Sequence, residues 1–86
     1  MRSVELHPRA VDDLTFWIRE DRRTALRIMD LLDACASDPF KGIGKPEPLK
    51  QNLKGLWSRR ITAEHRLVYR VTDERIMVMQ CRFHYE

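Results

Sequence analysis

The spacing of apolar residues changes from a helical to a strand-like period near the middle of the chain, and this change limits the possible folds more than any other feature. Between residues 9 and 36, apolar side chains recur at intervals of three and four, which predicts two amphipathic helices, over residues 9–20 and about 23–37. From residue 54, apolar and polar residues alternate, which predicts strands. Helices followed by strands in 86 residues favour one α+β domain over residues 1–86.

A short strand over residues 2–7 is expected before the helices, and three strands over residues 56–62, 65–72 and 75–85 after them. The order β-α-α-β-β-β predicts two N-terminal helices packed on one face of an antiparallel sheet. Residues 38–53, which are rich in Pro, Gly and Lys, are predicted to form a long loop. Loops of this length in compact domains are often functional.

Side-chain alternation predicts which residues face the helices. The helices are expected to supply a core of Ala10, Val11, Leu14, Trp17, Ile18, Ala25, Ile28, Met29, Leu32, Cys35 and Ala36. From the strands, the inward set is predicted to be Trp57, Ile61, Leu67, Tyr69, Val71, Met77, Met79, Cys81 and Phe83. The opposite set holds Ser58, Arg60, Arg66, Val68, Arg70, Ile76, Val78, Gln80, Arg82 and His84. One face of the sheet is therefore expected to stay open and to carry arginines and a histidine.

A single carboxylate lies between two prolines in the basic stretch GIGKPEPLK, residues 42–50. Proline fixes its own φ and disfavours a helical conformation in the residue before it, so Glu47 is expected to be extended and rigidly placed. This stretch is not a phosphate-binding P-loop, because Pro39 and Pro46 occupy positions where that motif requires Gly and Ser or Thr. Taken alone, Glu47 is an ordinary loop residue or a carboxylate presented at a fixed point.

The charge is unevenly distributed along the chain. Residues 1–40 carry a net charge of −2 and residues 41–86 a net charge of +5, and arginine supplies twelve of the sixteen basic residues. Arginine binds phosphate bidentately and stacks on bases, so nucleic acid is a natural partner, although an acidic protein surface fits the charge equally well.

The remaining signals set the class of protein. Two cysteines are too few for a disulfide scaffold and fit no zinc site, which favours buried free thiols in a reducing cytoplasm. The N-terminus does not resemble a signal peptide, and no apolar run is long enough to cross a membrane. No metal site and no cofactor are predicted.

An acid, a histidine and several arginines on one open face are the groups that metal-independent RNA cleavage requires. One group takes the proton of the 2′-hydroxyl, another protonates the 5′-oxygen, and cations stabilise the charge on the phosphoryl oxygens. Each of these residues taken singly is ordinary on a protein surface, and only their combination favours this chemistry.

The blocks GKPEPLK, WSRRIT–EHRLVY and CRFHY resemble the YoeB toxins of bacterial toxin–antitoxin systems, within the RelE superfamily. The resemblance implies a RelE-like fold akin to microbial ribonucleases, and cleavage of mRNA in the ribosomal A site. It also implies a YefM-like antitoxin, whose C-terminal segment blocks the active site, and a homodimer of the free toxin.

The resemblance also implies roles for individual residues. It assigns Glu47 as general base, Arg66 as the arginine that stabilises the transition state, His84 as general acid and Tyr85 as an aromatic group that shapes the site. Basic residues expected to bind RNA phosphate are Lys50 and Arg60 from the resemblance, and Arg82 from its place on the open face. Three other functions stay open: a ribonuclease that acts without the ribosome, a non-catalytic ParE-like toxin that binds a protein target, and a basic RNA-binding protein.

Overall fold

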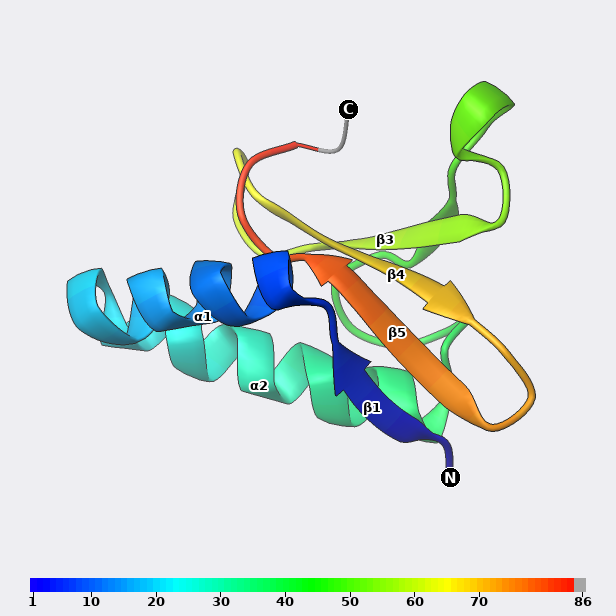
Figure 1. Cartoon of the computed structure of the whole chain (residues 1–86), viewed down its shortest axis with the longest axis horizontal. Helices are drawn as coiled ribbons and strands as arrows, with labels where there is room; N and C mark the ends of the chain where they lie inside the picture. Colours follow the sequence, from blue (N-terminus) through cyan, green and yellow to red (C-terminus); the bar gives the residue numbers. More distant parts are fainter. Residues whose placement is uncertain (85–86) are drawn as a thin grey trace.

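The computed structural model describes residues 1–84 and shows two helices on one face of a five-stranded sheet (Figure 1). Strand β1 (Ser3–Leu6) leads into helices α1 (Pro8–Glu20) and α2 (Arg22–Ser37). The sheet continues with β2 (Glu47–Pro48), β3 (Leu56–Arg60), β4 (Arg66–Val71) and β5 (Arg75–Gln80), and a short 3-10 helix, Gln51–Leu53, separates β2 from β3. The α+β class and the order of helices and strands are confirmed.

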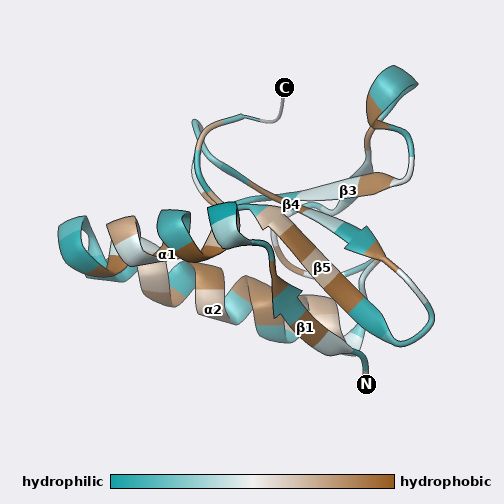
Figure 2. Cartoon of the chain, in the orientation of Figure 1, coloured by the Kyte–Doolittle hydropathy of each residue, from teal (hydrophilic) through white to brown (hydrophobic). Residues whose placement is uncertain are grey.

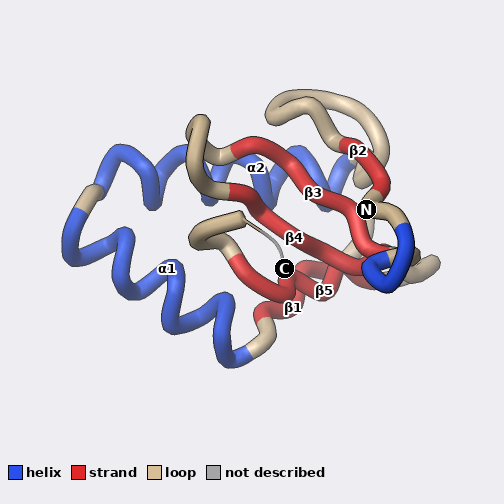
Figure 3. The backbone as a smooth tube through the Cα atoms, turned by 90° about the horizontal axis from the view of Figure 1, so that it is seen from above, coloured by secondary structure: helices blue, strands red, loops and turns tan. Residues whose placement is uncertain are grey.

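The sheet has the strand order β1-β5-β4-β3-β2 and is mixed (Figure 3). Strand β1 pairs in parallel with β5, whereas the other neighbouring strands are antiparallel. The expectation of a wholly antiparallel sheet is therefore wrong. The chain between β1 and β5 forms both helices and three strands, so it is long enough for the crossover that parallel pairing requires.

One acidic residue separates the two helices. Asp21 ends α1 and caps α2, where its carboxylate accepts hydrogen bonds from the backbone nitrogen (3.2 Å) and the hydroxyl (2.8 Å) of Thr24. These bonds satisfy a free N–H group at the start of the helix. They also lower the pKa of the Asp21 carboxyl, with the hydroxyl of Thr24 as the main cause. The helices therefore lie next to each other with almost no connecting loop (Figure 3).

The core lies between the helices and the covered face of the sheet. It contains Ala10 and Trp17 from α1, residues from α2, and Leu67, Tyr69, Ile76 and Val78 from the sheet. Strand β5 is hydrophobic along most of its length, whereas α1 alternates between hydrophobic and hydrophilic residues (Figure 2). The helical residues Val11, Ile18 and Met29, which were expected in the core, are exposed. Two helices side by side bury only the part of each surface that meets the sheet or the other helix.

A β-bulge changes which side chains of β5 face the core. Val68 lies opposite Gln80, but Tyr69 lies opposite Val78, so Met79 has no partner in β4. The extra residue shifts the alternation by one position. The predicted orientation is therefore wrong before the bulge, where Ile76 and Val78 are in the core and Met77 is not. After the bulge it is right for Cys81 but wrong for Phe83, which is exposed because the chain turns away from the strand at this residue.

Candidate functional site

Glu47 is held at the edge of the sheet by a short strand that the sequence did not predict. Residues 38–53 are not simply a loop, because Glu47 and Pro48 pair with Ser58 and Trp57 of β3. The backbone there is extended, as the flanking prolines predicted, and the Glu47 side chain is exposed. The backbone that carries the Glu47 carboxylate is thus fixed by strand pairing rather than part of a mobile loop.

A buried arginine fixes the segment that leads to Glu47. Arg59 is 0% exposed, and its guanidinium donates hydrogen bonds to the carbonyl oxygens of Ile43 (2.9 Å), Lys41 (2.9 Å) and Asp38, and to the hydroxyl of Tyr69 (3.2 Å). Within residues 1–84 it has no carboxylate partner. A buried cation with only neutral acceptors is tolerated because several hydrogen bonds replace its water. Arg59 therefore ties β3 to the loop before β2.

The loop also approaches the core closely at Gly44. Its φ is +83°, and a Cβ atom there would lie 2.8 Å from Cδ2 of Leu31 and 3.1 Å from Cβ of Arg59. The carbonyl of Gly44 accepts a hydrogen bond from the backbone nitrogen of Arg60 (2.6 Å). Only glycine fits this position without displacing its neighbours.

The sheet register places three of the predicted residues on the same face. Paired residues of adjacent strands point to the same side, and Glu47 pairs with Ser58, which pairs with Val68. Arg60 and Arg66 form another pair, two residues further along β3 and β4 from Ser58 and Val68. Both arginine side chains therefore project from the same face of the sheet as Glu47. With strands about 4.8 Å apart and about 3.4 Å per residue, the Cα atoms of Glu47 and Arg66 are separated by roughly 12 Å. Their side chains can bracket a group the size of a phosphate.

The two arginines form an unfavourable pair unless an anion is present. Like charges directly opposite each other on adjacent strands destabilise a sheet. Arg66 donates a hydrogen bond to the carbonyl of Thr62 (2.9 Å), and neither Arg60 nor Arg66 has a carboxylate partner within residues 1–84. This arrangement is typical of a surface that binds a multiply charged anion.

The chain after β5 turns back over this face instead of continuing the strand. The predicted strand over residues 75–85 is therefore too long, because pairing stops at Gln80. The Gln80 side-chain amide donates to the carbonyls of Arg82 (3.1 Å) and His84 (3.0 Å). The backbone nitrogen of Arg66 donates to the carbonyl of Phe83 (3.0 Å), so His84 follows a residue bound to the start of β4.

Helix α1 anchors the beginning of the same segment. The Asp13 carboxylate accepts a hydrogen bond from the backbone nitrogen of Cys81 (3.1 Å), and the Trp17 indole donates to the carbonyl of Cys81 (2.9 Å). We refer to residues 81–84 as the C-terminal segment. Its path from α1 to β4 is thus set by contacts at both ends (Figure 1).

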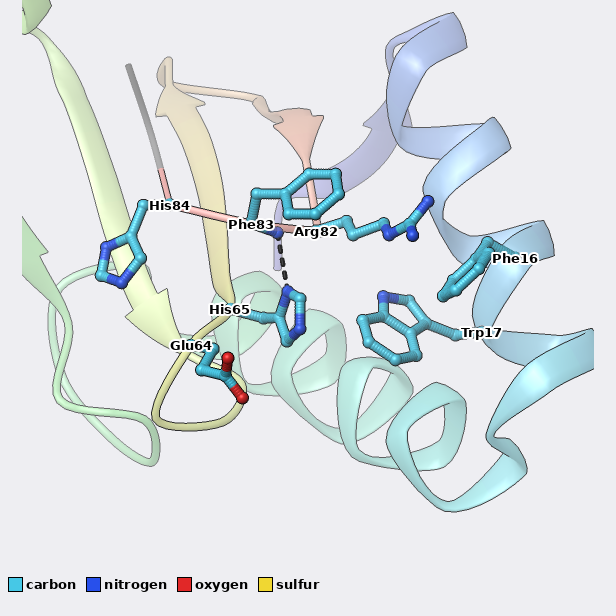
Figure 4. A pocket seen from close by; sticks show the side chains of 7 residues that line it. All are labelled: Phe16, Trp17, Glu64, His65, Arg82, Phe83 and His84. Carbon is cyan, nitrogen blue, oxygen red and sulfur yellow. Dashed lines mark hydrogen bonds between the residues drawn. The ribbon is translucent and has the colours of Figure 1, made fainter.

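A cleft of about 660 Å³ opens beside the C-terminal segment (Figure 4). Its lining consists of Phe16, Trp17, Glu64, His65, Arg82, Phe83 and His84. The guanidinium carbon of Arg82 lies 3.5 Å from the ring centroid of Phe16 and 4.5 Å from that of Phe83. Arg82, predicted to bind phosphate from an open strand face, lies instead in this aromatic stack next to α1. Its Nε atom is buried and has no hydrogen-bond partner within the described residues.

A second cleft, of about 430 Å³, is formed by residues 47–53 and contains both Glu47 and Lys50. Glu47, Arg60 and Arg66 thus share one face of the sheet, and Glu47 and Lys50 share the second cleft, whereas His84 lines the first cleft. Tyr85 lies outside the described residues. No group of three His, Cys, Asp or Glu side chains within residues 1–84 is arranged to hold a metal ion. None of the helices described could span a bilayer.

Three residues that shape this site were not predicted: Arg59, His65 and Gln80. A signal existed for Arg59, since it interrupts the apolar pattern between Trp57 and Ile61, where a charged residue must be buried or paired. Nothing in the sequence pattern distinguished His65 or Gln80, because both act through contacts with the turned C-terminal segment.

Known proteins are similar to this chain over nearly its whole length. The family described as YoeB-like toxin of bacterial type II toxin-antitoxin system matches residues 6–85. A YoeB toxin of Mycobacterium bovis is 53% identical over 85 residues, which cover 99% of this chain and 100% of that protein.

Solved structures are similar over nearly the whole chain. A YoeB/ParE toxin from Agrobacterium tumefaciens has a TM-score of 0.92 at 50% identity, with 96% of this chain and 99% of that chain covered. YoeB of Staphylococcus aureus is similar both as a dimer (TM-score 0.89, 40% identity, 98% of each chain) and in a heterotetrameric complex with YefM (TM-score 0.88, 40% identity, 99% of each chain).

Proposed function

Because the chain belongs to the family of YoeB-like toxins of bacterial type II toxin–antitoxin systems, we propose that it is a metal-independent endoribonuclease that cuts mRNA on the ribosome. Its action would stop translation. The observation that carries this proposal is the pair Arg60 and Arg66, directly opposed on one sheet face without carboxylate partners in residues 1–84, with Glu47 on the same face.

In the proposed reaction, the Glu47 carboxylate takes the proton of a ribose 2′-hydroxyl, and the 2′-oxygen attacks the adjacent phosphorus. The bond from phosphorus to the 5′-oxygen breaks, and the imidazolium of His84 gives its proton to that oxygen. The products are a 2′,3′-cyclic phosphate and a 5′-hydroxyl. Arg66 and Arg60 bind the phosphoryl oxygens as negative charge builds up on them.

The remaining predicted residues have supporting roles in this proposal. Lys50 lies in the same small cleft as Glu47 and would bind a neighbouring phosphate. Arg82, stacked between two rings, would present its charge at the edge of the larger cleft. Tyr85 follows His84 and would pack against a base of the bound RNA.

We also propose that a YefM-like antitoxin binds this chain and covers the site, and that the free toxin forms a homodimer. The support is the Staphylococcus aureus protein, which is known both as a dimer and in a complex with YefM. An acidic antitoxin segment would compete with RNA for the same arginines.

The test is cleavage of a defined mRNA by the purified protein, with and without translating ribosomes. Glu47→Gln, Arg66→Ala and His84→Ala should each lower kcat by about 10²–10⁴-fold, the usual contribution of a proton-transfer or charge-stabilising group. Arg70→Ala is the matched control for Arg66, because Arg70 is an exposed arginine on the same face and strand. Equal cleavage of free RNA would refute ribosome dependence, and full activity of the three variants would refute the catalytic assignment.

A further inference from the structure

The C-terminal segment is held by a histidine outside the proposed set of catalytic residues. The backbone nitrogen of Phe83 donates a hydrogen bond of 2.8 Å to Nδ1 of His65, drawn as the dashed line in Figure 4. Arg66 supplies a second bond to the same residue, from its backbone nitrogen to the Phe83 carbonyl. Phe83 has a φ of +66°, in the left-handed region that non-glycine residues rarely adopt. External contacts are therefore needed to hold this turn.

The contact with Phe83 fixes the protonation state of His65. To accept a hydrogen bond, Nδ1 must carry no proton, so a neutral ring must carry its proton on Nε2. An imidazolium has a proton on both nitrogens and cannot accept this bond. The ring is also set by edge-on packing against Trp17, with centroids 4.8 Å apart at 80°, and by a tilted contact with Phe83 at 5.8 Å.

We infer that His65 is a positioning residue: in its neutral form it holds the C-terminal segment so that His84 reaches the phosphate, and its protonation releases that segment. This inference rests on the proposed role of His84 as general acid. The two histidines then have opposite requirements, because His84 must carry the proton that it donates, whereas His65 must have Nδ1 unprotonated. Protonation would therefore give His84 the proton that it donates, but would break the hydrogen bond by which His65 holds the C-terminal segment.

The surroundings of His65 allow the effect of its hydrogen-bond acceptor to be separated from the effect of its aromatic ring. Its charged and titratable neighbours are Glu64 and Arg66 along the chain, and Arg82 and His84 across the cleft. Among residues 1–84, helix α1 lines this cleft with the uncharged rings of Phe16 and Trp17, and its Asp13 carboxylate binds the Cys81 nitrogen at the start of the C-terminal segment. Substitutions of His65 itself leave all of these groups in place.

Two substitutions separate the hydrogen bond from the ring. His65→Phe keeps an aromatic ring between Trp17 and Phe83 but removes the acceptor. His65→Asn places a carbonyl oxygen near the position of Nδ1, so it keeps the acceptor and cannot be protonated. The matched control is His7→Asn, because Nδ1 of His7 also accepts a backbone hydrogen bond, from Arg9 at the start of α1 (3.2 Å), away from the cleft.

The first measurement is hydrogen exchange of the Phe83 amide by NMR on the free protein, expressed as protection relative to the unstructured peptide. In the natural protein, protection should fall by about 10-fold as the pH drops from 8 to 5, the range in which histidines change charge. His65→Phe should show the low protection at every pH, and His65→Asn the high protection at every pH. Protection that is independent of pH in the natural protein, or unchanged in His65→Phe, would overturn the inference.

The second measurement is kcat for mRNA cleavage on ribosomes over the same range. His65→Phe should lower kcat by about 10-fold at neutral pH with little change in KM. His65→Asn should retain most of the kcat of the natural protein. The natural protein should also lose kcat between pH 7 and 5, and His65→Asn should not show this decline. If His84→Ala abolishes cleavage while His65→Phe leaves it unchanged, only this inference fails. If His84→Ala cleaves normally, the proposed function fails, and with it the catalytic importance of His65.

Discussion

Removing one buried hydroxyl should weaken both the fold and the presentation of Glu47. The Tyr69 hydroxyl, which is buried, accepts a hydrogen bond from Nε of Arg59 and donates one of 2.7 Å to the carbonyl of Pro39. Tyr69→Phe leaves a buried charged donor and a carbonyl each without one partner. Hydrogen bonds to charged groups contribute about 1.5–3 kcal/mol and neutral ones about 0.5–1.5 kcal/mol, so the free energy of unfolding should fall by about 2–4 kcal/mol.

This loss of stability is large enough to measure by urea unfolding that is monitored through tryptophan fluorescence. For a domain of this size, each kcal/mol lowers Tm by about 4–8 °C, so thermal unfolding should show a total decrease of about 8–32 °C. Thr15→Ala is the control, because the Thr15 hydroxyl bonds to the carbonyl of Val11 on an accessible helix surface, and its loss should cost under about 0.5 kcal/mol. If Tyr69→Phe matches this control, Arg59 does not depend on the phenol and the account of the buried network is wrong.

The same hydrogen bonds predict how the difference in unfolding free energy between the natural protein and Tyr69→Phe depends on pH. Burial raises the pKa of the Tyr69 phenol well above its usual value. The folded protein therefore favours the protonated phenol, whose stabilising contribution is fully present below the unfolded pKa of about 10 and is lost as the pH rises beyond it. The stability difference between the natural protein and Tyr69→Phe should be constant from pH 6 to 9 and shrink at higher pH.

Three further predictions follow from the described contacts. Gly44→Ala should lower the free energy of unfolding by more than 1 kcal/mol, since the new methyl group meets Leu31 in a backbone conformation that favours glycine; an unchanged urea midpoint would contradict this. Burial raises the pKa of the Cys81 thiol to about 12 and also raises that of Cys35, so neither should react with iodoacetamide at pH 8 unless urea is added, and mass spectrometry would detect any labelling. Asp21→Ala should destabilise the protein at pH 7, and the effect should shrink as the pH falls through the lowered pKa of the Asp21 carboxyl, because the stabilising contribution is lost when the carboxylate is protonated; an effect that does not change as the pH falls would exclude this cap.

The sequence was sufficient for the class of fold but not for the orientation of every strand. The change in apolar spacing predicted two helices and then a sheet, because these periods follow directly from backbone geometry. Strict alternation failed in β5, where Met79 is inserted without a partner and reverses the two faces for the residues before it. A bulge depends on pairing with another strand, so one strand's pattern does not reveal it.

The shared face of two predicted site residues could be read from the sequence, whereas the contacts that support the site could not. The prolines around Glu47 predicted its extended backbone, and alternation correctly placed Arg60 and Arg66 on one face. The turn that carries His84 depends instead on a contact with Gln80, four residues earlier, and on a bond between His65 and Phe83, neither of which is marked by the alternation of apolar and polar residues. Residue types favoured one hypothesis for the chemistry, whereas contacts outside the strand pattern determine the geometry.

The parallel pairing of β1 with β5 affects the order of events during synthesis. Ser3 lies beside Arg75, so the first strand of the chain cannot find its place until the last strand has been made. Contacts between such distant residues form late, because the intervening chain must first be ordered. His84 lies four residues beyond the end of β5, so the proposed ribonuclease site cannot assemble while the C-terminal residues are still inside the ribosome. The connectivity of the sheet thus delays completion of the fold, and with it of the proposed site, until those residues have left the ribosome that made them.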